Sequence, residues 1–595
     1  MFKIKQIYLS LLILSLITTS MGDSHCSSDE VELCGDCFHK TTTTTIDLSD
    51  EGCTGEIPTD IGLLINLTNL DLRDNDLSGS IPSQIGSLTN LTELHLQGND
   101  LTGEIPNIEN LTSLIYLDLA DNLLEDDDIL ESGSPIYQLT SLKRLSIQGY
   151  DRMELSGEFS SEIQLLVALE VIYLFGNNFS GEIPVEIWSL PELRELAVGG
   201  NDFTGSIPTE IGNATKLTWL DLGGNYIDGE IPTQIGSLIN LIQLNIPGER
   251  TKSVLSGTLP TEIGDMVNLE SLTIASHDLT GPIPPEIFPA TSKLKYLSLS
   301  DNQFTSIPSE IGALTDLRSL HLNGNQITSI PPDIGNLSAT LTHLDLQENQ
   351  LTDDIPSEIG SLVNLEVLNL NNNQLTGIPS EIENLVKLTE LKLHENRLIG
   401  GIPEEIGDLE ALTNLWLQHN QFGCETYDYV GNECTTYCDG TNGCTGQIPS
   451  SIFASGNLPN LTYLDIGRNE LTGGIPSEIS NLTSLEVLIL ELNHFTEPIP
   501  ASITGMSTLT ELCIREMNLT GDIPSNIGDM NLTNLELRDN QLGCYAYDPV
   551  AEECTEYCDD NDSNGCTGEI PSSIGSMDLT HLNLQKNQLS GEIPI

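Results

Sequence analysis

Basic residues are scarce in this 595-residue sequence, where 21 Lys and Arg stand against 88 Asp and Glu and the formal net charge is −67. Proteins bind the phosphate backbone of nucleic acids through Lys and Arg, whose contacts release condensed counterions. A strongly acidic chain repels that backbone, and it repels anionic lipid surfaces for the same reason. We therefore expect neither a nucleic-acid partner nor adhesion to an anionic membrane.

Long apolar runs are missing after the first residues. Two lysines precede an apolar run at 7–17, and the small residues Ser20 and Gly22 follow it, as in a signal peptide that covers residues 1–22. The run is shorter than the ~20 residues that cross a bilayer, so an uncleaved anchor is the weaker interpretation. The sequence given has no other candidate transmembrane span, and we expect a secreted or cell-surface protein.

Motifs of the common catalytic sites are also missing. The sequence contains no HExxH, no GxxxxGK[ST], no GxSxG and none of the protein-kinase motifs. Carboxylate pairs are abundant, but at this acid content they arise everywhere and do not indicate glycoside hydrolysis. We expect no enzyme activity, no cofactor and no metal site.

What the sequence does contain is a repeat of 24 residues, with the pattern LxxLxLxxNxLxGxIPxxIGxL, as in residues 67–88. Its asparagine column holds Asn75, Asn99, Asn122, Asn177, Asn201, Asn225, Asn302, Asn325, Asn349, Asn373, Asn396, Asn420, Asn469, Asn493, Asn540 and Asn587. Five further copies carry Glu51, Tyr150, Glu249, His277 and Met517 in that column. The sequence therefore has 21 recognisable copies, between residues 46 and 595.

Each part of the repeat has a physical role. LxxLxL alternates apolar and polar residues with the period of a strand, so the leucines face inward and the other residues outward. The asparagine amide can both donate to and accept from the backbone of its own and the neighbouring turn, which Met517 cannot do. No copy has a core alone, so the copies must stack.

The repeat resembles the plant-specific class of leucine-rich repeats, which occurs in receptor-kinase ectodomains and polygalacturonase-inhibiting proteins. The resemblance implies an α/β-type repeat solenoid, a curved horseshoe with a parallel β-sheet on the concave face and a mostly irregular or 3-10 convex side. It also implies a non-catalytic recognition protein whose concave face binds an extracellular peptide, protein or glycan. An inhibitor of a secreted cell-wall hydrolase and a structural, cation- or ice-contacting surface protein are the alternatives.

Twelve of the 13 cysteines fall into three groups of four that interrupt the repeat. The first group lies in residues 23–53, where a solenoid needs an N-terminal cap. The other two lie in cysteine-rich turns at 423–444 and 543–566, which we count as additional turns, 23 in all. Export favours disulfides over a zinc site, and the spacing does not choose the pairing. The groups are Cys26, Cys34, Cys37, Cys53; Cys424, Cys434, Cys438, Cys444; and Cys544, Cys554, Cys558, Cys566.

Cys513 is left over, in an outward column of a predicted strand. One interpretation is a small, half-buried thiol without a role. The other is an intermolecular disulfide with a partner, or a modifiable thiol on the ligand-binding face.

The outward columns hold the candidate ligand-binding residues. Exposed aromatic patches mark contact surfaces, and these residues gather near two insertions at 150–155 and 249–255 and around the first cysteine-rich turn. The candidates are Tyr116, Tyr173, Phe175, Trp219, Trp416, Tyr463, Val487 and Ile489. Eleven bases lie on the same strands, either to keep a binding face less acidic or to pair with acids on neighbouring strands.

Eleven Asn-x-Ser/Thr sequons permit N-glycosylation of an exported chain. They are Asn66, Asn90, Asn110, Asn178, Asn213, Asn336, Asn460, Asn481, Asn518, Asn531 and Asn561.

Two further features leave alternatives open. The acidic excess suits a saline habitat, where salt screens self-repulsion, or else it binds divalent cations. The repeat stops in mid-copy at 590–595, which indicates either a frayed last turn or a longer chain that continues into a membrane span or kinase.

Overall fold

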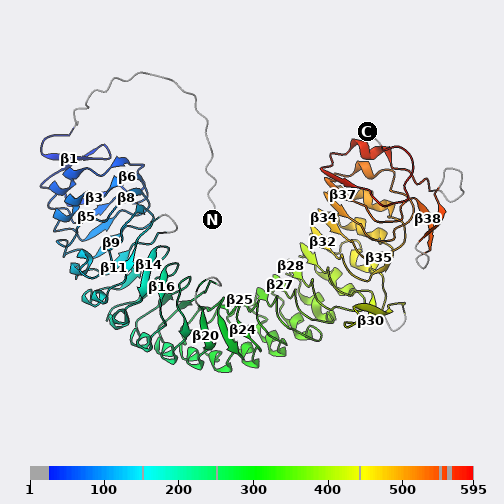
Figure 1. The fold of residues 1–595 in the computed structure, drawn as a ribbon, viewed down its shortest axis with the longest axis horizontal. Helices are drawn as coiled ribbons and strands as arrows, with labels where there is room; N and C mark the ends of the chain where they lie inside the picture. The colour runs from blue at the N-terminus through cyan, green and yellow to red at the C-terminus, as the bar shows by residue number, and fades with distance from the viewer. Residues whose placement is uncertain are drawn as a thin grey trace, which may run out of the picture.

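The computed structural model describes residues 26–149, 153–249, 252, 254–440, 444–548, 553–558 and 566–593. These residues form a curved solenoid with the outline of a horseshoe (Figure 1). The predicted signal peptide, Tyr150 and the sequon at Asn561 lie outside the described residues.

One parallel sheet of 21 strands lines the inner side of the horseshoe, with one strand in each repeat (Figure 1). Successive strands pair in register, so that Leu70 lies beside Leu94 and Leu94 beside Leu117. The strands are β3 (Thr45–Asp47), β5 (Asn69–Asp71), β7 (Glu93–His95), β9 (Tyr116–Asp118), β11 (Arg144–Ser146), β13 (Val171–Tyr173), β15 (Glu195–Ala197), β17 (Trp219–Asp221), β19 (Gln243–Asn245), β21 (Ser271–Thr273), β23 (Tyr296–Ser298), β25 (Ser319–His321), β26 (His343–Asp345), β27 (Val367–Asn369), β28 (Glu390–Lys392), β29 (Asn414–Trp416), β32 (Tyr463–Asp465), β34 (Val487–Ile489), β36 (Glu511–Cys513), β37 (Asn534–Glu536) and β40 (His581–Asn583).

Short 3-10 helices follow the Ile-Pro step of the repeats. A proline with extended dihedral angles precedes most of them, for example Pro82 before η2, and leads the chain into the helix without an unpaired N–H group. They are η1 (Thr59–Leu63), η2 (Ser83–Ser87), η3 (Pro135–Gln138), η4 (Ser161–Leu165), η5 (Val185–Ser189), η6 (Thr209–Asn213), η7 (Thr233–Ser237), η8 (Thr261–Asp265), η9 (Pro285–Ile287), η10 (Ser309–Ala313), η11 (Pro332–Leu337), η12 (Ser357–Ser361), η13 (Ser380–Asn384), η14 (Glu404–Asp408), η15 (Ser450–Phe453), η16 (Ser477–Asn481), η17 (Ala501–Gly505), η18 (Ile527–Asp529) and η19 (Ser572–Ser576).

Smaller parallel sheets form after the asparagine turn in part of the repeats. Their strands are β4 (Thr54–Glu56), β6 (Asp76–Ser80), β8 (Asp100–Gly103) and β10 (Leu123–Leu124); β12 (Ser156–Glu158), β14 (Asn178–Glu182) and β16 (Asp202–Thr204); β18 (Gly229–Glu230), β20 (Leu255–Thr258), β22 (Asp278–Gly281) and β24 (Gln303–Phe304); and β33 (Thr472–Gly473) and β35 (His494–Phe495).

The asparagine column forms a buried ladder along the solenoid. Asn201 is 1% exposed. Its Nδ2 donates to the carbonyl oxygens of Leu174 at 3.0 Å and Val198 at 3.0 Å, and its Oδ1 accepts from the N–H of Phe179 at 3.1 Å. Each asparagine therefore ties its own turn to the preceding one, as the repeat predicts.

His277 replaces asparagine in this ladder and makes equivalent bonds. Its Nδ1 accepts from the N–H of Leu255 at 3.2 Å, and its Nε2 lies 2.7 Å from the carbonyl oxygen of Ile246. This arrangement requires a neutral ring with the proton on Nε2. Burial lowers the pKa of His277, in agreement with a neutral ring.

We expect His277→Asn to raise the melting temperature at pH 5, by a few degrees, and to change it little at pH 8. Below about pH 6.5 the unfolded histidine binds a proton that the folded ring excludes, so the wild type loses stability as the pH falls. Thermal unfolding at the two pH values, with the exposed His39 substituted by Asn as the control, measures the effect. An equal gain at both pH values would contradict the titration of His277.

The N-terminal cap is an antiparallel hairpin of β1 (Glu30–Leu33) and β2 (Asp36–His39). Disulfides join Cys26 to Cys37 and Cys34 to Cys53. The cap places Val31 and Leu33, 1% and 2% exposed, against the first turn of the core.

Each cysteine-rich segment also forms an antiparallel hairpin, which projects from the outer side near the C-terminal end (Figure 1). The first consists of β30 (Cys424–Asp428) and β31 (Glu433–Tyr437), and the second of β38 (Cys544–Asp548) and β39 (Glu553–Tyr557). The four disulfides are Cys424–Cys434, Cys438–Cys444, Cys544–Cys554 and Cys558–Cys566.

The prediction that these segments add two turns is wrong. Strand β29 pairs directly with β32, and β37 pairs with β40, so neither hairpin separates neighbouring strands of the inner sheet. After the first hairpin the chain resumes the same turn, where the carbonyl oxygen of Gly446 accepts from Thr472 N–H at 2.7 Å. The hairpins are excursions within existing turns.

Candidate functional site

The inner sheet presents two aromatic clusters, and the C-terminal one is the more continuous. Trp416 on β29 and Tyr463 on β32 lie 5.2 Å apart between ring centroids, and the Lys392 ammonium lies 4.8 Å above the Trp416 ring. Val487 and Ile489 follow on β34, whose first residue lies beside Tyr463 in the sheet. We call these five residues the C-terminal patch.

The N-terminal cluster combines Tyr173 and Phe175 with Trp219. The Tyr173 ring lies 5.2 Å from Trp219 and 6.5 Å from Phe175, and the Arg144 guanidinium lies 4.7 Å above it. The Tyr173 hydroxyl also donates to Glu195. These contacts order the cluster before any ligand arrives.

Tyr116, predicted as part of the same surface, stacks instead on His95, at 6.5 Å. Sequence reasoning missed a third pair, Tyr296 and His321 on β23 and β25, whose rings lie 5.3 Å apart. Tyr296 is 38% exposed, as is Tyr116. The place of Tyr296 in an outward column of the repeat was the signal that could have identified this pair.

A buried carboxyl lies beside the C-terminal patch. Asp465 is 7% exposed and pairs in register with Trp416 on one side and Ile489 on the other. Its Oδ1 accepts from the N–H of Gly467 at 2.9 Å. Burial raises the pKa of Asp465 to about 6, and the nearby Glu491 carboxylate acts in the same direction.

Most of the bases on the inner strands pair with acids. This favours the prediction that the bases pair with acids over the prediction that they keep a binding face less acidic. Lys143 reaches Glu170 and Lys295 reaches Glu270, both at 2.7 Å. At the C-terminal end a chain of ion pairs crosses successive turns. Its members are Arg468, Glu491, Arg515, Glu516, Arg538, Asp539 and Lys586. These bases are therefore compensated by acids, and the C-terminal patch differs from them in its aromatic and aliphatic residues.

Cys513 has no disulfide partner and is 7% exposed. Its Sγ lies 3.2 Å from Oε2 of Glu491. Burial raises the pKa of the thiol to about 12, and the hydrogen bond to Glu491 adds to this shift. A buried thiol that stays protonated does not favour the predicted intermolecular disulfide.

Lys252, within the insertion at 249–255, contacts earlier turns of the solenoid. The ammonium donates to the carbonyl oxygens of Gly224 at 2.9 Å and Asn201 at 3.2 Å, and it lies 5.0 Å from the Tyr226 ring centroid. These contacts hold Lys252 against the turns of Asn201 and Gly224, away from the C-terminal patch. Residues 250, 251 and 253 of this insertion lie outside the described residues. Of the insertion at 150–155, residues 150–152 lie outside the described residues.

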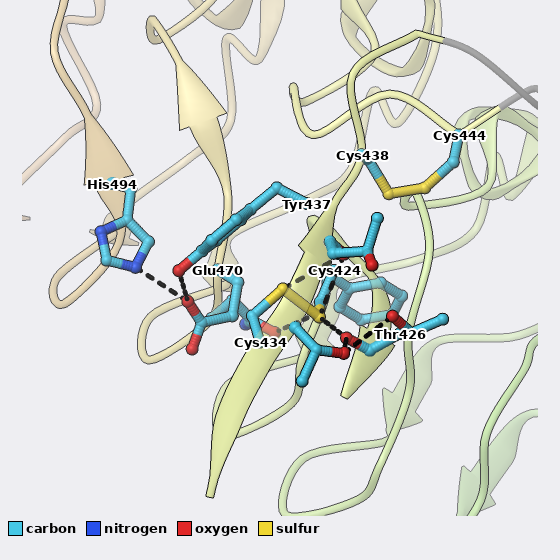
Figure 2. Close-up of a disulfide and its surroundings, with 12 residues drawn as sticks. Cys424, Thr426, Cys434, Tyr437, Cys438, Cys444, Glu470 and His494 are labelled. Carbon is cyan, nitrogen blue, oxygen red and sulfur yellow. Dashed lines mark hydrogen bonds and ion pairs between the residues drawn. A yellow bond between two sulfur atoms is a disulfide. The ribbon is translucent and has the colours of Figure 1, made fainter. Parts of the chain in front are cut away.

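A cleft that the sequence did not reveal lies between the first hairpin and the asparagine turns. Its volume is about 750 Å³, and its walls include Tyr427, Asn432, Arg468, Glu470 and His494. Figure 2 shows how Glu470 holds the hairpin: it accepts from the Tyr437 hydroxyl at 3.4 Å and lies 2.8 Å from Nε2 of His494. Tyr429 also donates to the carbonyl oxygen of Arg397, on the other side of the hairpin, at 3.3 Å.

The ten sequons among the described residues lie on the surface, with the exception of the half-buried Asn518. Several of them donate through Nδ2 to the carbonyl oxygen of the preceding turn, as Asn90 does to Ile65 at 2.9 Å.

In the described ranges, no helix has the length and apolar character of a membrane-spanning segment.

Sequence profiles of leucine-rich repeats match most of the solenoid. The profile described as a leucine-rich repeat region matches residues 46–205, and the profile described as a leucine rich repeat matches 315–375, 339–398 and 364–422. Shorter profiles, described as leucine rich repeats (2 copies) and leucine rich repeat, match 292–336 and 216–238 with 460–482. The comparison with curated proteins gave no match.

Solved structures of receptors share the fold. The plant peptide hormone receptor RGFR1, in complex with RGF2, is 31% identical, with a TM-score of 0.74, and the match covers 92% of this chain and 87% of that one. A TDR receptor has 27% identity and a TM-score of 0.74 over 93% and 90% of the two chains. The Arabidopsis receptor kinase HAESA, in complex with the peptide hormone IDA and the co-receptor SERK1, has 27% identity and a TM-score of 0.65 over 84% and 87%.

The architecture is therefore that of solved ligand-binding receptors, with a curved inner sheet as its principal surface. It belongs to the leucine-rich repeat family, and its repeats are similar to those of plant receptor-kinase ectodomains. Proteins with such ectodomain-like repeats are generally non-catalytic.

Proposed function

We propose that the protein is an extracellular, non-catalytic recognition module that binds a peptide on the inner sheet, with the C-terminal patch as the main anchor. The observation that carries the proposal is the continuous row of Lys392, Trp416, Tyr463 and the two aliphatic residues of β34. Aromatic side chains of this kind dominate the energetics of many binding surfaces.

An extended peptide suits this surface better than a compact ligand. The outward columns repeat with every strand, so a peptide that runs along the arc meets equivalent positions at regular intervals. The N-terminal cluster around Trp219 offers a second anchor further along the same sheet. Solved neighbours bind peptide hormones, which supports the choice of ligand class.

An extracellular location agrees with six disulfides, which persist in oxidising compartments. Receptor ectodomains among the structural neighbours point in the same direction. Neither the hydrolase-inhibitor role nor the structural role has an observation of its own in the described residues, so we do not propose them.

Selection of a phage-displayed peptide library against the purified protein tests the proposal. We expect Trp416→Ala to weaken the selected peptides about 30-fold, because removal of a central aromatic anchor costs about 2 kcal/mol. Tyr545→Ala removes an exposed tyrosine from the outer hairpin strand β38 and serves as the control that should bind normally. Peptides that bind Trp416→Ala and the wild type equally would refute the assignment of the anchor.

A further inference from the structure

We infer that the cleft beneath hairpin β30–β31 is a second binding site, and that its ligand is a neutral saccharide. This site is separate from the C-terminal patch, because neither Trp416 nor Tyr463 lines the cleft. Its volume of about 750 Å³ lies in the range of small-molecule sites, which is roughly 300–1,000 Å³.

The charged groups around the cleft already have partners, which disfavours strongly charged ligands. Glu470 contacts His494 at 2.8 Å, and Arg468 reaches Glu491 at 3.4 Å. Glu516 and Asp539, at the far wall, both pair with Arg538. A phosphate or a polyamine would meet charges that already have partners, and the acidity of the whole chain further repels an anionic polymer.

The uncharged polar groups match a ligand that is rich in hydroxyls. Gln421, Asn432 and Asn518 line the cleft. An amide carries both donor and acceptor groups, although the Asn432 oxygen already accepts from Tyr427. Each hydroxyl of a sugar is likewise a donor and an acceptor, so adjacent hydroxyls can pair with planar amides in both directions. A purely apolar ligand would leave these groups without partners, at a cost of about 1–3 kcal/mol for each buried group.

Tyr427 supplies the apolar wall that a sugar ring requires. It projects from β30 into the cleft, and its ring centroid lies 5.0 Å from that of Tyr429. Its hydroxyl donates to Oδ1 of Asn432 at 3.3 Å, which leaves the Asn432 amide nitrogen as a donor. A tyrosine ring can pack against the C–H face of a pyranose while its hydroxyl stays hydrogen-bonded.

Three contacts fix the hairpin that forms the wall: one disulfide within it and one hydrogen bond on each side. The Cys424–Cys434 disulfide joins its two strands, Glu470 holds Tyr437 on one side, and the carbonyl oxygen of Arg397 accepts from Tyr429 on the other (Figure 2 shows the first two). A preformed wall loses little conformational entropy when a ligand binds, which favours a weakly binding ligand such as a sugar. The second hairpin has Pro549 and Glu552 where the first has Tyr429 and Asn432, so it lacks two of these groups.

Saturation-transfer NMR and isothermal titration calorimetry on the purified full chain test the inference, with cellohexaose, laminarihexaose and xylohexaose as neutral probes and trigalacturonate as the anionic probe. We expect at least one neutral hexaose to bind with a Kd below about 1 mM. Tyr427→Ala should weaken it about tenfold. Asn432→Gly should weaken it about threefold; glycine tolerates the φ of 54° at this position, so the hairpin keeps its backbone.

The controls separate this site from the peptide site. Tyr545→Ala on the second hairpin and Trp416→Ala on the inner sheet should both bind the sugar as the wild type does. No binding by any neutral hexaose at about 5 mM, or binding by trigalacturonate alone, would overturn the inference. Equal binding by wild type, Tyr427→Ala and Asn432→Gly would overturn it as well, and none of these results would affect the peptide proposal.

Discussion

Replacing Asn201 by alanine is expected to lower the free energy of unfolding by about 3 kcal/mol. The substitution leaves the buried N–H of Phe179 without an acceptor. It also removes one of the two amide donors to Leu174 and to Val198, whose other donors are Asn177 and Asn225. The loss acts on two turns, because the amide joins its own turn to the preceding one.

Asn240 offers a matched control for this experiment. It is an exposed asparagine that makes a single bond, from Nδ2 to the carbonyl oxygen of Thr215 at 2.8 Å. We expect Asn240→Ala to cost less than about 1 kcal/mol, because water can replace that bond. Urea denaturation followed by circular dichroism measures both variants. Equal losses would show that the ladder contributes no more than a surface contact.

Replacing Asp465 by asparagine is expected to stabilise the protein at pH 7.5 by up to about 3 kcal/mol and to change little at pH 4. The folded pKa of Asp465 is about 6, above the ordinary value of 3.8, so the folded state holds the proton more tightly than the unfolded chain. The protonated Asp465 carboxyl therefore adds to the free energy of unfolding. This contribution is fully present below the unfolded pKa and is lost as the pH rises through about 6. Asparagine keeps an acceptor for the N–H of Gly467 and never ionises.

Thermal and urea unfolding at both pH values test this prediction. Asp76→Asn, on the exposed side of β6, serves as the control and should alter stability little at either pH. A gain of equal size at pH 4 and pH 7.5 would show that ionisation of Asp465 is not the cause. The same pH profile applied to peptide binding would report whether the charge beside Trp416 affects the ligand.

The sequence predicted most of the fold, because the repeat determines each turn independently. Inward leucines such as Leu70 and ladder asparagines such as Asn201 follow from their column alone. The outward columns also identified Trp416 and Tyr463 as surface residues, although their contact depends on the pairing of β29 with β32 across a long insertion.

Features that depend on contacts between distant segments could not be predicted in this way. The cysteine spacing shows that the first hairpin interrupts the repeat, but it does not show that the chain rejoins the same turn. The burial of Cys513 depends on side chains of adjacent turns, such as Glu491, which cover an outward position. The cleft beside Tyr427 exists because the hairpin folds back toward Glu470 and His494, and no local pattern encodes that direction.

Each of the two hairpins leaves and rejoins the solenoid within a single turn. A segment of that kind can be lengthened, exchanged or deleted without shifting any leucine or asparagine that follows it. The scaffold and its attachments can therefore vary independently, so a new specificity can be grafted onto one turn while the curvature of the whole stays the same. The two hairpins, alike in their cysteines and different at the residues of the cleft, are an example of such separate variation within one molecule.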